Sequence, residues 1–167
     1  KSPPAAGAAA AKAAGMRYVV FTTKHHDGFS MFDTRQTDYR ITSPGVPFHT
    51  HPKADIAKAV FDAFRAQGLG TGAYFSKPDW HHPDFWAPEW ATPDRNVNYS
   101  IDKYPDRWQR FRDFTYRQIE EIVSGYGPLD VLWLDGGWVR PAPMVEIAPG
   151  HFVKNPKNMD IDMPKIA

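Results

Sequence analysis

The chain has no cysteine among its 167 residues, which excludes disulfide bonds and metal sites built on thiolate ligands. It also lacks a long apolar run, since no segment approaches the roughly 20 apolar residues that a membrane-spanning helix needs. Neither sign of charge dominates, because 20 lysines and arginines face 19 acidic residues. We therefore expect no membrane insertion and no binding to nucleic acid.

The first 14 residues contain little besides alanine and do not begin with methionine. They lack the strongly apolar centre of a secretory signal, although an alanine-rich helix that stops before Gly15 is compatible with them. We divide the chain into a poorly defined alanine-rich segment, residues 1–14, and one globular unit, residues 15–167. The absence of cysteine does not identify the cellular compartment.

Aromatic residues are abundant: six tryptophans, seven tyrosines and eleven phenylalanines make up 14% of the chain. Several tryptophans lie among proline, histidine and glycine, in segments typical of loops. This placement favours a surface that faces carbohydrate. The alternative is that these rings pack long loops onto the scaffold.

Three strand-like runs alternate with two helical patterns. Residues 17–23 and 70–76 are rich in β-branched and aromatic side chains, and residues 129–135 form an apolar run of the kind that is buried on both faces. Apolar residues recur at helical spacing over 55–67 and again after Pro105, where the stripe consists of Trp108, Phe111, Thr115, Ile119 and Ile122. This alternation predicts an α/β protein with a parallel sheet.

Three strands cannot close a barrel. A complete (β/α)8 TIM-like barrel takes about 250 residues, so we interpret residues 15–167 as a central fragment of one, with about three parallel strands and their crossover helices. An open doubly wound sheet is the alternative, but no glycine-rich phosphate loop follows any of the predicted strands. In both architectures ligands bind at the carboxyl ends of the strands.

Asp135 ends the third predicted strand and is followed by Gly136 and Gly137. Because side chains alternate along a strand, Trp133 and Asp135 should point to the same side. An aromatic surface beside a carboxylate suits a sugar, and the glycines leave space for a pyranose. A strand-end aspartate can instead begin a turn or cap a helix.

His25 and His26 directly follow the first predicted strand and precede the turn signal Asp27-Gly28. Adjacent residues within a strand face opposite sides, so both rings can reach one ligand only beyond the end of the strand. There they could hydrogen-bond sugar hydroxyls. A zinc site is the rival interpretation, but no HExxH pattern or further ligand series accompanies the pair. We predict neither a metal nor a cofactor.

Three motifs in order resemble those of α-L-fucosidases of glycoside hydrolase family 29. They are KHHDGF at 24–29, AYFS at 73–76 with Asp79-Trp80 behind it, and LWLDGGW at 132–138. The resemblance extends from about Gly15 to the C-terminus. It implies a retaining exo-glycosidase that removes terminal α-linked L-fucose on a (β/α)8-like barrel.

The resemblance also implies roles for individual residues. Asp135 matches the catalytic nucleophile, and His25, His26, Tyr74 and Trp133 match residues that line the fucose pocket. Trp80, in the long loop after the second strand, is also expected at the substrate site, as part of the pocket wall. The implied partner is a fucosylated oligosaccharide or glycoconjugate. Periplasmic, secreted and lysosome-like locations are all compatible with the resemblance, which also leaves the oligomeric state open.

A retaining glycosidase needs a second carboxylate as general acid and base. The resemblance implies that a later loop supplies it, and none of Glu89, Glu120 and Glu146 is assigned to that role. Two other functions remain open at this stage. One is a carbohydrate-binding relative without catalysis, and the other is a metal-dependent barrel hydrolase.

Overall fold

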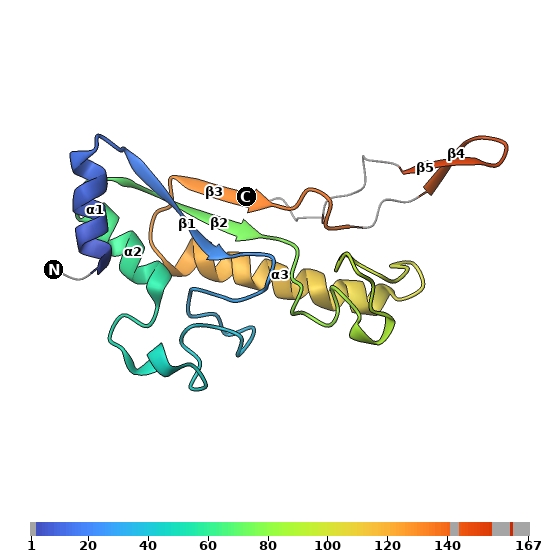
Figure 1. Cartoon of the computed structure of the whole chain (residues 1–167), viewed down its shortest axis with the longest axis horizontal. Coiled ribbons are helices and arrows are strands. Elements are labelled where there is room, and N and C mark those ends of the chain that lie inside the picture. Colours follow the sequence, from blue (N-terminus) through green and yellow to red (C-terminus); the bar gives the residue numbers. More distant parts are fainter. Residues whose placement is uncertain (1–2, 141–143, 155–160, 162–167) are drawn as a thin grey trace.

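The computed structural model describes residues 3–140, 144–154 and 161. Its helices and strands follow one another along the chain (Figure 1) as α1 Pro3–Ala13, β1 Tyr18–Lys24, η1 Pro47–Thr50, α2 Ile56–Arg65, β2 Gly70–Ser76, η2 Pro88–Trp90, α3 Pro105–Gly125, β3 Val131–Asp135, β4 Met144–Ala148 and β5 His151–Lys154. The three strands predicted from the sequence are β1, β2 and β3, and the two predicted crossover helices are α2 and α3.

The strands β1, β2 and β3 form a parallel sheet in that order, which confirms the predicted α/β class with a parallel sheet. Tyr74 of β2 lies opposite Thr22 on one side and Trp133 on the other. The register between β1 and β2 slips by one residue before Lys24. Because all three strands run the same way, their carboxyl ends and the loops that follow them meet at one edge of the sheet.

Local signals explain where the helices begin and end. The side chain of Asp55 caps α2 by accepting the Lys58 backbone N–H at 3.0 Å, and Gly68 provides a positive φ of 72° just after the helix. Pro105 occupies the first turn of α3, where its missing N–H costs nothing. The stripe predicted for α3 is buried as expected: Trp108, Phe111, Thr115, Ile119 and Ile122.

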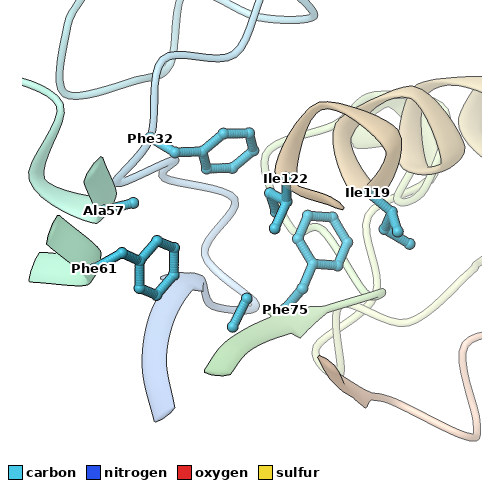
Figure 2. Close-up of a cluster of buried hydrophobic side chains, with 7 residues drawn as sticks. Phe32, Ala57, Phe61, Phe75, Ile119 and Ile122 are labelled. Carbon is cyan, nitrogen blue, oxygen red and sulfur yellow. The ribbon is translucent and has the colours of Figure 1, made fainter. Parts of the chain in front are cut away.

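The main core lies between the sheet and the two crossover helices, as Figure 2 shows. Phe61 of α2, Phe75 of β2 and Ile122 of α3 are fully buried there, together with Phe32 from the loop after β1. Burial of each such side chain contributes roughly 1.5–3 kcal/mol. This cluster fixes the helices on one face of the sheet and leaves the other face to Tyr74, whose hydroxyl bonds to Asp135.

The described residues do not test whether the third strand is buried on both faces, because the strand lies at the edge of their sheet. Here β3 is an edge strand that pairs with β2, and the Trp133 side chain is 57% exposed. The strand also begins at Val131 rather than Leu129, because the Asp130 carboxylate instead accepts the Thr71 backbone N–H at 2.8 Å. An apolar sequence makes a strand suitable for burial, but the strands and helices next to it determine how much of it is buried.

The remaining elements lie outside this sheet. Helix α1 packs against α2, and the Lys12 ammonium donates to the Gln67 carbonyl at 2.7 Å. The antiparallel pair β4 and β5 was not predicted, because the sequence analysis identifies no strand after residue 135. No helix in the described parts of the chain is both long and apolar enough to cross a membrane.

Candidate active site

The carboxylate of Asp135 lies at the carboxyl edge of the sheet, opposite Ser76 of β2. Its side chain is 30% exposed, so solvent reaches it. One oxygen, Oδ1, accepts the Gly136 backbone N–H at 2.8 Å. The other, Oδ2, accepts a short hydrogen bond from the Tyr74 hydroxyl, which also lies 3.0 Å from the Ser76 hydroxyl. As predicted, Trp133 shares this face, with its ring 6.1 Å from that of Tyr74.

These contacts favour the ionised form of the carboxyl group. The hydrogen bond from Tyr74 is the largest influence and lowers the pKa of Asp135, an effect that the Gly136 N–H reinforces. Conversely, burial and the bond to Asp135 raise the pKa of the Tyr74 hydroxyl. The site therefore holds a protonated tyrosine against a carboxylate that stays charged at neutral pH.

His25 and His26 lie beyond the end of β1, as the sequence predicted. The Gly28 backbone N–H donates to the His25 carbonyl at 3.0 Å, and a φ of 85° at Gly28 closes the turn. The two rings stack with centroids 4.5 Å apart, and His25 also stacks on Tyr74 at 5.9 Å. The turn thus brings both imidazoles to the face that carries the carboxylate.

His26 is the ring nearest to Asp135, with Nε2 3.9 Å from Oδ2. This distance exceeds a hydrogen bond but is close enough for electrostatic interaction. Burial lowers the pKa of His26, and its neighbour His25 lowers it further against the opposing pull of Asp135. The imidazole is therefore neutral at pH 7 and can both donate and accept a hydrogen bond.

Two tryptophans pack against His26 at right-angled or tilted geometry. Trp80 lies 5.6 Å away between ring centroids, and Trp138 lies 5.9 Å away. Both are partly exposed, at 37% and 46%. Trp80 was predicted as a site residue, whereas Trp138 was not, although it closes the same LWLDGGW motif as Asp135. Its position three residues after Asp135 was the sequence feature that could have identified Trp138 as a site residue.

Behind this face lies a buried ion pair that the sequence did not predict. The Lys24 ammonium is 3.0 Å from Oδ2 of Asp79, and both side chains are almost entirely inaccessible. Burial lowers the pKa of Lys24, and the carboxylate opposes this shift. Burial raises the pKa of Asp79, but the ammonium reverses that effect and the net shift is downward.

The long segment after β2 is packed rather than loose. Phe85 and Tyr99 form a second buried cluster with Trp108 and Phe111 of α3. Three other rings of this segment also have aromatic neighbours: His82 packs on Phe111 and Phe114, His81 stacks on Tyr39, and Trp90 lies against Tyr104.

The described residues do not contain a cluster of three or more histidine, aspartate or glutamate side chains that could hold a metal ion. Among the acids considered for the second catalytic role, Glu89 pairs with Arg107 at 2.7 Å. Glu146 lies on the hairpin of β4 and β5 and accepts the Gly150 backbone N–H. Neither contact involves the residues around Asp135.

An ionised carboxylate framed by histidine, tyrosine and tryptophan at the carboxyl edge of a parallel sheet is the kind of site found in glycoside hydrolases built on α/β folds. The family comparison agrees and narrows the class. The chain belongs to the alpha-L-fucosidase family, because the model of that family matches residues 3–165.

Relatives of known sequence and structure support this assignment. The chain is 36% identical over 127 residues to a putative alpha-L-fucosidase of Caenorhabditis elegans, covering 76% of this chain and 22% of that protein. Alpha-L-fucosidase isoenzyme 1 of Paenibacillus thiaminolyticus superposes with a TM-score of 0.62 at 41% identity, over 80% of this chain and 30% of that one. The chain thus spans about a quarter of the length of the relatives it matches.

One solved structure bears directly on chemistry. A family 29 alpha-L-fucosidase of Bacteroides thetaiotaomicron, trapped as a covalent intermediate with 2-fluoro-fucosyl fluoride, superposes with a TM-score of 0.65 at 28% identity. The match covers 81% of this chain and 28% of that structure.

Proposed function

We propose that the protein is a retaining α-L-fucosidase that removes terminal α-linked fucose from oligosaccharides or glycoconjugates, with Asp135 as its nucleophile. The observation that carries this proposal is the geometry of Asp135: a carboxylate kept ionised by Tyr74 and Gly136, partly open to solvent, at the carboxyl edge of a parallel sheet. Family membership and the covalent intermediate of the Bacteroides relative support it.

In the first half of the proposed reaction, an Asp135 oxygen attacks the anomeric carbon of fucose. The carbon–oxygen bond to the aglycone breaks, and the departing oxygen takes a proton from a general acid. A fucosyl ester of Asp135 results. In the second half, water replaces the ester, the same acid/base group removes a proton from the water, and Asp135 is released as a carboxylate. We assign the acid/base role to no residue of this chain.

The neighbouring side chains have roles that suit this chemistry. The neutral His26 and its stacked partner His25 hydrogen-bond the sugar hydroxyls, and Trp80 and Trp133 offer ring faces to its apolar side. Tyr74 orients the carboxylate and holds it ionised. In the whole protein these groups line the mouth of a (β/α)8 TIM-like barrel, of which β1, β2 and β3 form one part.

Hydrolysis of a chromogenic aryl α-L-fucoside by the native full-length protein tests this proposal. The Asp135→Ala variant should lose activity on the order of 10⁴-fold or more, as expected for an essential catalytic group. Added azide should restore turnover and yield β-fucosyl azide, because azide enters the space left by the carboxylate. Asp130→Asn is the matched control, since Asp130 precedes the same strand at its other end.

Each of three results would count against the proposal. Absence of fucoside hydrolysis by the folded wild-type protein would exclude the activity. Hydrolysis that survives in Asp135→Ala without azide, or azide rescue that occurs equally in Asp130→Asn, would exclude Asp135 as the nucleophile.

A further inference from the structure

The buried ion pair of Lys24 and Asp79 ties the first two site loops together. Lys24 is the last residue of β1, one position before His25, and Asp79 lies three positions after the end of β2. The ammonium also donates to Oε1 of Gln118 on α3 at 3.1 Å. The Lys24 ammonium therefore joins two residues that lie 55 and 94 positions away from it in the sequence.

Stability alone does not account for such a pair. Transfer of two charges from water into a protein interior costs several kcal/mol each, and well-packed apolar residues of similar size are often as stable or more so. Unlike apolar residues, the ion pair makes directional hydrogen bonds. These bonds fix the positions of the ammonium and the carboxylate relative to each other.

The second carboxylate oxygen of Asp79 links the ion pair to the loop that contains Trp80. Asp79 Oδ1 accepts the backbone N–H groups of His81 at 3.0 Å and His82 at 2.9 Å, which fixes the turn that contains Trp80. The Trp80 backbone N–H in turn donates to the His26 carbonyl at 2.7 Å. Asp79 thus fixes the distance between the His26 and Trp80 rings, although its own side chain is buried behind the face that carries Asp135.

Gly28 shows how closely the two loops approach. A Cβ atom added there would lie 2.3 Å from Oδ1 of Asp79 and 2.9 Å from Cβ of His81. No real side chain tolerates such contacts, so the turn after His26 can lie against Asp79 only because residue 28 is glycine. The same glycine adopts a positive φ of 85°.

We propose that Lys24 and Asp79 are a positioning pair that holds His26 and Trp80 at the spacing the sugar site requires. The pair acts through backbone hydrogen bonds and contacts no substrate. Its effect on catalysis rests on the proposed fucosidase function, whereas its effect on the order of His26 does not.

The test compares two variants of the native full-length protein. Lys24→Met/Asp79→Asn removes both charges at nearly constant volume, leaves no unpaired buried charge and retains an Oδ1 acceptor. Asp84→Asn is the control: it lies in the same loop and loses contacts to Arg107 at 3.2 Å and Arg110 at 2.9 Å, away from His26. If the double variant does not fold, Lys24→Arg replaces it, because it keeps a cation beside Asp79 but changes the geometry of the hydrogen bonds.

The first measurement does not depend on activity. Diethyl pyrocarbonate modifies accessible imidazoles, and peptide mass spectrometry locates the product at His26, whose side chain is 15% exposed. We expect His26 to react several times faster in the double variant and at the wild-type rate in Asp84→Asn. Equal rates in the two variants would overturn the proposal.

The second measurement separates positioning from loss of folded protein. A reduced folded fraction lowers the apparent kcat and leaves KM unchanged, whereas misplaced binding groups raise KM. We expect KM for an aryl α-L-fucoside to rise about 10–100-fold in the double variant, the usual range for supporting residues around a site. An unchanged KM would contradict the proposal. If the wild type hydrolyses no fucoside, the proposed function fails and the reactivity of His26 still decides the role of the pair.

Discussion

The replacement Gly136→Ala probes the turn that directly follows the candidate nucleophile. Gly136 has a φ of 91°, and an added Cβ would lie 2.3 Å from Cδ and 2.7 Å from Cγ of Pro78. The left-handed conformation costs a non-glycine residue about 1–2 kcal/mol, and displacement of the proline ring adds about 1–3 kcal/mol. We expect the variant to lose about 2–5 kcal/mol of its free energy of unfolding.

The adjacent glycine is the matched control. Gly137 has no positive φ, and an added Cβ would meet nothing within 4 Å. Gly137→Ala should therefore change the free energy of unfolding by no more than about 0.5 kcal/mol. Urea unfolding of the two full-length variants, followed by tryptophan fluorescence, measures the difference directly.

Activity should separate the two variants as well. The Gly136 N–H donates to Oδ1 of Asp135, so a displaced turn also displaces the carboxylate. Misplacement by about 1 Å can lower a rate about 100-fold. The reasoning is refuted if Gly136→Ala and Gly137→Ala unfold at the same urea concentration, or if Gly136→Ala hydrolyses an aryl fucoside at the wild-type rate.

Three other changes test separate parts of the structure. Tyr74→Phe removes the hydrogen bond that lowers the pKa of Asp135, so this pKa should rise and the acidic limb of kcat/KM should move to higher pH; an unmoved limb would contradict this. Phe61→Ala deletes a fully buried ring and should cost about 3–5 kcal/mol in urea unfolding, which an unchanged midpoint would disprove. Asp55→Ala removes both the cap of α2 and an acceptor of the Tyr126 hydroxyl, and it should cost about 1–2 kcal/mol, with Asp55→Asn recovering much of the loss.

Elements marked by strong local signals could be predicted from the sequence. The strand over 70–76 has the predicted bounds, because a glycine stop precedes it and β-forming residues fill it. The buried stripe of α3 follows from its helical period. The exposure of Trp133 was not predictable in this way, because burial of a strand depends on which segments pair with it and cover it.

The same distinction applies to the site. Strand alternation placed Asp135 and Trp133 on one face, and the turn signal at Asp27-Gly28 placed both histidines beyond the strand. The pair of Lys24 and Asp79 was not predicted. Its two residues lie at the starts of different loops, and these loops come close together only when the strands pair in the folded sheet. A lysine at the end of an otherwise uncharged strand was the one available sign of a buried partner.

The slipped register at the end of β1 determines which face receives a positive charge. Thr22 lies opposite Tyr74, but Lys24 lies opposite Phe75, so Lys24 joins the face that packs against the helices. Strict alternation would have turned its ammonium toward Asp135 instead. The extra residue before Lys24 is thus under electrostatic constraint: in a regular strand of the same length Lys24 would lie opposite Ser76 and place a cation beside the proposed nucleophile.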